Sequence, residues 1–180
     1  MKWIKSWNES IRSKYVELGV DDYYKSNKAD YKNPHSERVT KSLDYIISKI
    51  DIGYFLDLAC GDGIVSEHLK SKGFTNFKGS DPHFFEIYEN KFGVECDDST
   101  FQDIANNGFN EKFDTIICSY ALHLCPKSYF NNLLYQLAMS CNNFVVISPS
   151  KFPIIEEDYF ELVDNKVIDR THVRIYKSNL

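Results

Sequence analysis

The sequence has no excess of positive charge and no long apolar run, and each absence excludes a class of protein. Its 180 residues include 21 Lys and Arg against 26 Asp and Glu, so the net charge of −5 does not indicate nucleic-acid binding, although a local basic patch stays open. No stretch approaches the roughly 18 apolar residues that a membrane-spanning helix requires. Residues 1–10 lack the apolar core of a secretory signal, so we expect a cytoplasmic protein with no membrane association.

The positions of the cysteines and histidines predict neither a disulfide framework nor a metal site. The five cysteines are odd in number, fall mainly in apolar segments and include no CxxC pair. Reduced thiols fit this pattern better than disulfides or zinc. His68, His83 and His172 match no metal-ligand spacing, so we predict that no metal is bound.

The chain does contain enough apolar sequence for one compact domain. Hydrophobic residues make up 43% and charged residues 26%, which is ordinary for a globular protein and argues against disorder or a coiled coil. We expect a single domain over residues 1–180, because this length leaves little room for a second core. Within it, residues 1–36 are predicted to form an N-terminal helix and lid segment, and residues 37–180 the core.

Short apolar runs alternate with amphipathic stretches along the core. The runs cover residues 54–58, 77–80, 115–119 and 144–148 and are rich in β-branched and aromatic residues, which predicts strands. The stretches around them have apolar residues at helical spacing, which predicts four amphipathic helices. Their apolar positions are Val39, Leu43, Ile46, Ile47 and Ile50 in the first, Ile64, Val65 and Leu69 in the second, Phe85, Tyr88 and Phe92 in the third, and Phe130, Leu133, Leu134, Leu137 and Cys141 in the fourth. This order predicts an α/β fold in which helices cover both faces of a parallel sheet. Two alternating segments, 160–163 and 172–176, predict an antiparallel hairpin at the sheet edge.

The most informative segment is residues 57–63, Asp-Leu-Ala-Cys-Gly-Asp-Gly, between the first strand and a helix. Its glycines allow a sharp turn and the close approach of a ligand to the main chain, where open α/β sheets bind ligands. A dinucleotide site would have a third glycine where this chain has Ser66. Asp57 and Asp62 would also repel a pyrophosphate but suit a cation. The charge pattern therefore favours S-adenosylmethionine, which carries an ammonium and a sulfonium but no phosphate, over NAD.

Asp81 follows the second predicted strand, 18 residues after Gly63. An ionised carboxylate only accepts hydrogen bonds, whereas the two hydroxyls of a ribose can both donate. Asp81 is therefore a candidate ribose-binding residue. It could also cap the helix that follows Pro82, and the two roles are compatible.

In this order the motifs resemble those of the class I S-adenosylmethionine-dependent methyltransferases, over roughly residues 43–176. The segment DLACGDG resembles the glycine loop of that family, SDP at 80–82 its acidic ribose-binding position, and FDTIICS at 113–119 its fourth strand. The terminal hairpin resembles its reversed edge strand. The resemblance implies a small, single-domain, Rossmann-like member with a doubly wound, mostly parallel seven-stranded sheet. It also implies methyl transfer from S-adenosylmethionine, with S-adenosylhomocysteine as product.

The resemblance further implies which residues hold the cofactor. The methionine end would be held by Asp57, Leu58, Ala59, Cys60 and Gly61, and the ribose by Asp81 with Pro82 beside it. An acidic residue after the third strand would contact the adenine amino group, and Asp97, Asp98 and Asp103 are the candidates. The spacing to Asp114 favours Asp103, with the Ile104 amide beside it. Ser119 would line the cofactor near the transferable methyl group.

The range of possible methyl acceptors is narrowed mainly by motifs that the sequence lacks. After the fourth strand the chain reads Ser-Tyr-Ala-Leu-His-Leu, without the Asn/Asp-Pro-Pro-aromatic motif of amino-methyltransferases that act on bases and glutamine. The Pro-Cys motif of cytosine-C5 enzymes and the Lys-Asp-Lys-Glu set of ribose 2′-O-methyltransferases are also missing. These absences favour a small molecule, or an exposed group on a protein or RNA, as the acceptor.

Residues near the predicted fourth strand and before the core are candidates for the acceptor side. His123 is a candidate general base, which the reaction needs only if the acceptor must lose a proton; packing at the edge of the site is the alternative. Tyr24, Tyr31 and His35, together with Tyr120, could close over the cofactor, or the first three could belong to an ordinary surface loop. Two other functions stay open, a methyltransferase-like scaffold subunit and an NAD-dependent oxidoreductase.

Overall fold

A computed structural model describes residues 35–180, all of which belong to one compact unit. Tyr24, Tyr31 and most of the predicted lid segment lie outside the described residues, so those expectations stay predictions. The same holds for the division of the chain at residue 36.

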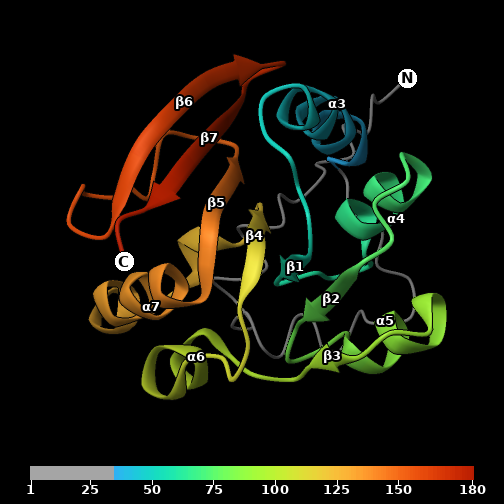
Figure 1. The fold of residues 1–180 in the computed structure, drawn as a ribbon, viewed down its shortest axis with the longest axis horizontal. Helices are drawn as coiled ribbons and strands as arrows, with labels where there is room; N and C mark the ends of the chain where they lie inside the picture. Colours follow the sequence, from blue (N-terminus) through green and yellow to red (C-terminus); the bar gives the residue numbers. More distant parts are fainter. Residues whose placement is uncertain (1–34) are drawn as a thin grey trace, which may run out of the picture. The chain divides into compact units, whose positions relative to one another are not determined.

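The described residues form one sheet with the strand order β3-β2-β1-β4-β5-β7-β6 (Figure 1). Strands β1 to β5 run parallel, and β7 runs antiparallel to both of its neighbours, β5 and β6. This confirms the predicted seven-stranded, mostly parallel sheet that ends in an antiparallel hairpin. The strands are β1 Phe55–Leu58, β2 Phe77–Ser80, β3 Cys96–Asp97, β4 Phe113–Ser119, β5 Cys141–Ser148, β6 Phe160–Ile168 and β7 Thr171–Ser178.

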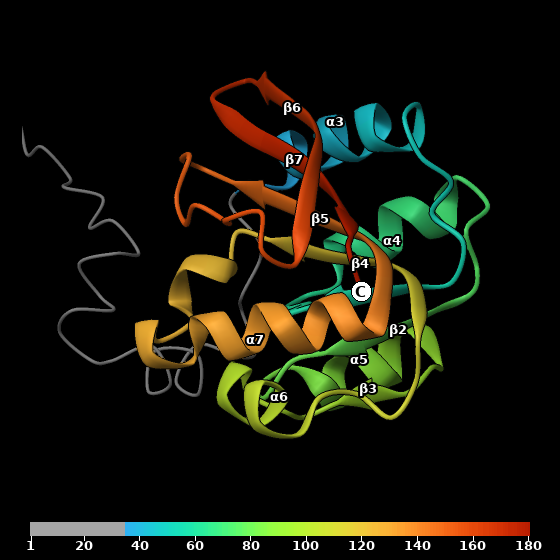
Figure 2. The same cartoon turned by 60° about the vertical axis from the view of Figure 1, so that its left-hand side comes forward.

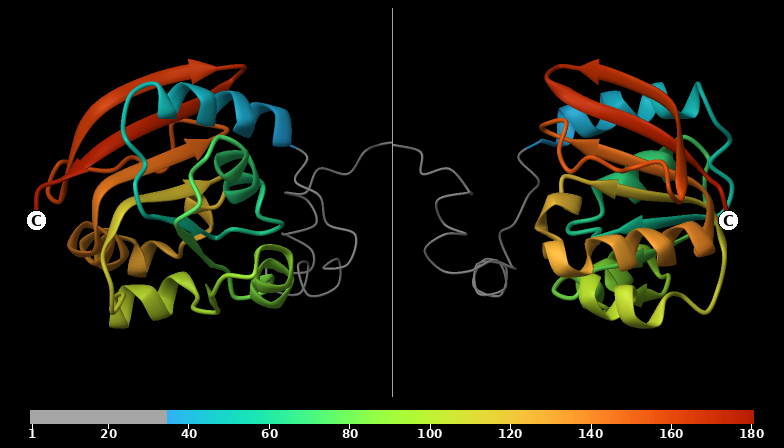
Figure 3. Two further views of the ribbon diagram at one scale, coloured as in Figure 1. Left: turned by 45° about the vertical axis from the view of Figure 1, so that its right-hand side comes forward. Right: turned by 90° about the vertical axis from the view of Figure 1, so that its left-hand side faces the viewer.

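Helices cover both faces of the sheet, as the alternating pattern predicts. On one face α3, α4 and α5 pack against a core that includes Val39, Phe55 and Tyr88. On the other, α6 and α7 pack against a core that includes Ile116 and Phe144, and Figure 2 and the right-hand view of Figure 3 show these two helices on the near side of the sheet. The helices are α3 Ser36–Ile47, α4 Ile64–Ser71, α5 Phe85–Phe92, α6 Phe101–Asn107, the one-turn 3₁₀ helix η1 Leu122–Leu124 and α7 Lys127–Ser140. None of the helices in the described part combines the length and apolarity needed to cross a membrane.

Two residues that the apolar spacing predicts to be helical lie outside the helices of the structure. Cys141, predicted at the end of the fourth helix, has an extended backbone and begins β5, where it pairs with Phe113 of β4. Cys141 continues the apolar spacing of α7 although it is the first residue of β5. The spacing alone therefore does not show where the helix ends and the strand begins. Ile50 lies beyond α3, which ends at Ile47.

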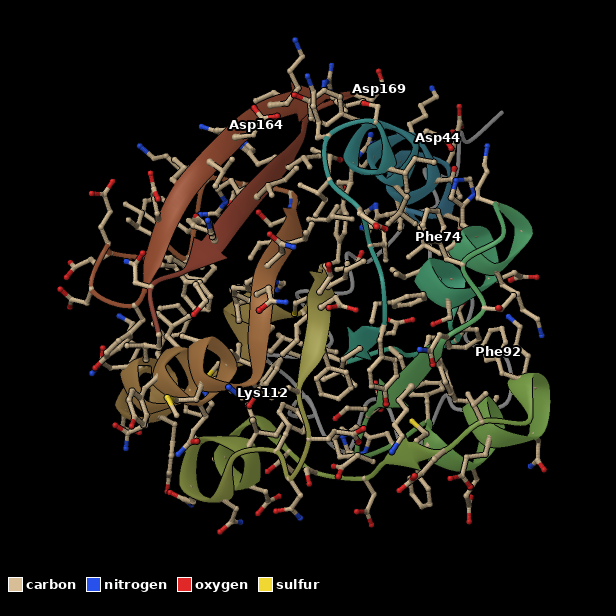
Figure 4. All side chains as sticks on the ribbon, viewed as in Figure 1. Asp44, Phe74, Phe92, Lys112, Asp164 and Asp169 are labelled. Carbon is tan, nitrogen blue, oxygen red and sulfur yellow. The ribbon has the colours of Figure 1, made fainter. Side chains whose placement is uncertain are left out.

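The connection from β5 to β6, residues 149–159, contains no helix. The hairpin of β6 and β7 is instead attached to α3 by side chains. Tyr45 donates a hydrogen bond to Asp164 at 2.6 Å, and Lys41 lies 2.7 Å from Asp169; both aspartates are labelled at the α3 end of the hairpin in Figure 4. The Lys41–Asp169 pair is exposed and contributes little stability, but together with the part-buried Tyr45–Asp164 bond it holds the hairpin next to α3, the helix that carries His35 at its start.

Candidate active site

The carboxyl ends of β1, β2 and β4 lie side by side. Leu58, the last residue of β1, pairs with Ser80 of β2 on one side and with Cys118 of β4 on the other. The residues that follow these strands therefore share one end of the sheet, with the glycine loop after β1, Asp81 after β2 and Ser119 at the end of β4. The crevice outside these strand ends is where open α/β sheets bind ligands.

The loop after β1 turns through left-handed backbone conformations. Ala59, Gly61 and Gly63 have φ values of +56°, +52° and +78°, and the Gly63 amide donates to the Cys60 carbonyl at 2.9 Å before α4 begins. At Ala59 this conformation costs about 1–2 kcal/mol, because its Cβ crowds the following carbonyl. Tyr120, just after β4, also has a φ of +56°. Backbone strain of this kind gathers at ligand sites, and here it follows two neighbouring strands.

Asp57 lies at the base of the glycine loop and is only 1% exposed. Its Oδ2 accepts hydrogen bonds from the Ser66 amide at 3.2 Å and the Ser66 hydroxyl at 2.8 Å, and that hydroxyl also bonds to the Tyr88 hydroxyl. Burial raises the pKa of Asp57 to about 7; the bonds from Ser66 oppose this rise, and the charges of Asp62 and Asp81 add to it. Near neutral pH the carboxyl is therefore poised between its neutral and ionised forms, and a cation beside it would favour the ionised form.

The contacts that hold this carboxyl are not evident from the sequence. There Ser66 stands out only as the residue in place of a third glycine, and Tyr88 only as an apolar helix position. Both side chains are fully buried. A buried tyrosine hydroxyl usually has a hydrogen-bond partner, so a tyrosine and a serine at buried positions of α5 and α4 are the signal that could have revealed the contact.

Asp81 joins the glycine loop to the turn before α5. Its Oδ2 accepts from the Gly61 amide at 3.0 Å, while its Oδ1 accepts from the amides of His83 and Phe84 at 2.8 and 2.9 Å. These bonds stabilise the turn at residues 81–84 but do not cap α5, which begins at Phe85 with Phe84 as its N-cap and has no side-chain cap, so the predicted capping role was wrong. The carboxylate is 8% exposed and fixed relative to the glycine loop. Its ribose-binding role stays a prediction.

The three acidic candidates for the adenine position lie on different elements. Asp97 ends β3, and its carbonyl accepts from the Asp81 amide at 2.9 Å, which places it beside the ribose candidate. Asp103 is exposed in the first turn of α6, where it forms a capping box with Thr100. Hydrogen bonds from the Thr100 hydroxyl and amide lower the pKa of Asp103. Asp98 is exposed between these two positions.

The remaining cofactor candidates are partly core residues. Leu58 and Ile104 are buried, at 1% and 2% exposure. The Cys60 side chain also points into the core, with its Sγ 3.7 Å from that of Cys96. Of these residues, only Cys60 has its main chain in the glycine loop, between Ala59 and Gly61, which both have positive φ. Pro82 lies in the turn directly after Asp81.

Two serine hydroxyls at the strand ends have no hydrogen-bond partner among the residues that the structure describes. They are the buried Oγ atoms of Ser80, at the end of β2, and Ser119, at the end of β4. Buried polar atoms are nearly always paired, so an unpaired hydroxyl at each of two strand ends fits a polar ligand at this site. A nucleoside with an attached amino acid offers groups of the required kind, and the residues present therefore fit the cofactor that the motifs imply.

Two of the predicted acceptor-side residues meet. The rings of His35 and Tyr120 stack with their centroids 4.4 Å apart and their planes 17° apart, and the Tyr120 hydroxyl lies 2.6 Å from the Thr171 hydroxyl at the start of β7. Burial, and then the charge of Arg38, lower the pKa of His35. His123 lies on the exposed side of η1.

Comparisons with known proteins agree with this architecture. No family model matches the chain. An uncharacterized protein of Schizosaccharomyces pombe is 28% identical over an alignment that covers 94% of this chain and 92% of that protein.

Solved structures of methyltransferases have the same fold. The N-methyltransferase NodS of Bradyrhizobium japonicum, in complex with S-adenosylhomocysteine, has a TM-score of 0.65 at 15% identity and covers 94% of this chain and 98% of its own. The magnesium protoporphyrin IX methyltransferase ChlM of Synechocystis, with bound S-adenosylmethionine, has a TM-score of 0.61 at 16% identity, with 93% and 94% covered. The 16S rRNA methylase RmtB has a TM-score of 0.60 at 18% identity, with 93% and 83% covered. This chain therefore has the fold of the class I methyltransferases.

Proposed function

We propose that this protein is an S-adenosylmethionine-dependent methyltransferase. The observation that carries the proposal is the pair of fixed carboxyl groups on either side of the glycine loop, with Asp57 held by Ser66 and Asp81 held by the Gly61 amide. A pair of carboxylates here opposes a diphosphate and suits a cationic nucleoside. ChlM and NodS, which have this fold, hold S-adenosylmethionine and S-adenosylhomocysteine in their crystal structures.

Each end of the cofactor has a candidate partner on this chain. Asp57 would face the ammonium of the methionine end, Asp81 would accept from the ribose hydroxyls, and the unpaired Ser119 hydroxyl would lie near the transferable methyl group. For the adenine end we retain Asp103 with Ile104, and Asp97 is the alternative because it ends β3 beside Asp81. When bound, S-adenosylmethionine supplies an electrophilic methyl group on its sulfonium.

The protein's own part in catalysis would be to position the acceptor. Methyl transfer requires the acceptor atom and the methyl group to be in line, and holding them so accounts for much of the rate. His35 and Tyr120 form a stacked wall on the β4 side of the site, and Thr171 fixes Tyr120. His123 would act as a base only for an acceptor such as a hydroxyl, which must lose a proton.

The fold does not identify the methyl acceptor, because proteins with this fold act on different acceptors. RmtB is a 16S rRNA methylase, ChlM methylates magnesium protoporphyrin IX, and NodS is an N-methyltransferase. For this chain we propose a small-molecule acceptor, because the motifs of several macromolecule-modifying families are missing from its sequence.

Calorimetric titration of the full chain with S-adenosylmethionine, S-adenosylhomocysteine and NADH tests the proposal. We expect the first two ligands to bind and NADH not to bind. Asp81→Ala should weaken binding by about 1.5–3 kcal/mol, the scale of a hydrogen bond to a charged group. The exposed Asp158 supplies the control, and Asp158→Ala should leave the affinity unchanged.

The outcomes separate the three functions. Binding of S-adenosylmethionine followed by transfer of labelled methyl to a fractionated small-molecule extract would support the enzyme. No binding by the unmodified protein would favour the scaffold subunit, and binding of NADH alone would favour the oxidoreductase. Unchanged affinity in Asp81→Ala would remove the ribose assignment.

A further inference from the structure

Arg174 is a buried arginine that forms no ion pair with the carboxylates of residues 35–180. It lies in β7, opposite Val146 of β5, and is 5% exposed. Its Nη1 donates to the carbonyls of Lys151 and Pro153 at 3.1 and 2.7 Å. Its Nε and Nη2 are buried and have no hydrogen-bond partner of good geometry among residues 35–180. No described carboxylate forms an ion pair with it, although a buried charge is normally paired.

The two unpaired atoms, Nε and Nη2 of Arg174, are the pair of donors with which an arginine binds an oxyanion. Nε and one terminal nitrogen of a guanidinium form a planar fork that binds a carboxylate or phosphate through two parallel hydrogen bonds. In Arg174 the other terminal nitrogen, Nη1, is occupied by the main chain, so the side chain is held while its fork stays open. Tyr176, two residues along β7, supplies no negative charge: burial raises the pKa of its hydroxyl, while the charge of Arg174 and a hydrogen bond with that side chain oppose the rise.

Arg174 lies under the segment that leaves the carboxyl end of β5. That strand ends at Ser148, and Tyr120 of the proposed acceptor wall donates its amide to the Ile147 carbonyl at 2.7 Å. Residues 149–154 therefore start beside the proposed methyl-transfer site.

The segment over Arg174 is attached mainly through polar contacts. They are the two carbonyls that accept from Arg174 and a hydrogen bond from the Ser148 hydroxyl to the Ser150 carbonyl. The side chains of Phe152 and Ile154 are 54% and 60% exposed instead of buried in the core. Little apolar packing would have to be broken for the segment to shift and admit a ligand.

We propose that the open fork of Arg174 binds an oxyanion, a carboxylate or a phosphate, on the methyl acceptor. The acceptor would then be an organic anion whose charged end lies under residues 150–153, while its methylated atom lies toward the cofactor site. This inference rests on the proposed function, because it assigns the acceptor of that reaction.

The test measures anion binding by the full chain in the presence of S-adenosylhomocysteine. Sodium acetate and inorganic phosphate are titrated separately at constant ionic strength, with chloride as the balancing ion. The variant Arg174→Gln can still donate to a loop carbonyl but has neither charge nor fork. The matched control is Lys151→Gln, which removes an exposed positive charge from the same segment and keeps the carbonyl that accepts from Arg174.

We expect saturable binding of at least one anion to the unmodified protein, and a loss of about tenfold or more in Arg174→Gln, the value of one hydrogen bond to a charged group. Lys151→Gln should lose less than about twofold, since exposed charges contribute little. Preference for acetate would indicate a carboxylic acid acceptor, and preference for phosphate a phosphorylated one.

The contrary results are equally distinct. Absence of saturable anion binding, or equal binding by Arg174→Gln, would overturn the inference. If Arg174→Gln does not fold, Arg174→Lys keeps the charge without the fork, and undiminished anion affinity in that variant would also overturn it. Binding of S-adenosylhomocysteine is measured in the same samples, so failure of the proposed function would appear as loss of that binding in the unmodified protein.

Discussion

The buried carboxyl of Asp57 gives the sharpest prediction about stability, and Asp57→Asn is the perturbation that tests it. Asn has nearly the same shape, can accept the same bonds from Ser66, and is neutral at every pH. Folding raises the pKa of Asp57 from 3.8 to about 7, mainly through burial. Between these two values the folded protein holds a proton that the unfolded chain has released, so the stability that this group contributes is lost as the pH rises through about 7.

The magnitude follows from the size of the shift. A rise of about three pKa units corresponds to about 4 kcal/mol, because each unit is worth about 1.4 kcal/mol. At pH 8 we therefore expect Asp57→Asn to unfold with a free energy roughly 2–4 kcal/mol higher than the unmodified protein, where the lower value allows for the amide N–H that Asn buries. Between pH 6 and pH 8 the difference should grow by about 1 kcal/mol.

Urea denaturation at pH 6, 7 and 8 measures this difference, and calorimetry on the same samples measures cofactor affinity. The control is Asp158→Asn, the same chemical change on the surface, which should alter the free energy of unfolding by less than about 0.5 kcal/mol. Asp57→Asn should become more stable and bind S-adenosylmethionine more weakly, because the ammonium loses its counter-charge. A variant that is no more stable than the unmodified protein, with a difference independent of pH, would refute the reasoning.

Two further predictions concern the local structure around the site. A Cβ at Gly63 would collide with the ring of Phe92, whereas one at Gly73 would meet nothing, and both residues have positive φ; Gly63→Ala should therefore lower the free energy of unfolding by roughly 2 kcal/mol more than Gly73→Ala. Equal losses in urea denaturation would contradict this. Thr100→Ala removes the side-chain cap of α6 and should cost about 1 kcal/mol in the same assay. Ser99→Ala, one residue outside the cap, should cost much less, and equal losses would argue against the cap.

The fold was predictable because its signals are local. The run at 77–80 is β2 and the apolar spacing of Phe85 and Phe92 marks the ends of α5, both as observed. Elements without such a signal were missed. Strand β3 has only two residues, and α6 begins with a capping box instead of an amphipathic stripe. Strand β5 begins three residues before its apolar run, since its backbone pairing extends to Cys141.

The site was predictable only in part, because its chemistry depends on contacts between elements. The sequence places carboxylates after β1 and β2, and the register of Leu58 with Ser80 brings those strand ends together. It does not show that Ser66 and Tyr88 would surround Asp57, since these residues come from two helices. The sequence also does not show that Arg174 is buried. In β7 it stands between Val173 and Ile175, and the structure buries all three residues.

Asp57 and Arg174, two of the three buried charged residues in the described part of the chain, have the same physical implication. Ionising Asp57 in the folded state is unfavourable because the carboxyl is desolvated, and Arg174 is buried without a carboxylate partner among residues 35–180. Burial of a charged side chain at either position carries a desolvation cost. A fold that retains both, one on each side of the carboxyl end of β4, is less stable than it could be, which is expected where the missing counter-charges belong to ligands. The unlike signs then indicate two different ligand groups, an ammonium at Asp57 and an oxyanion at Arg174.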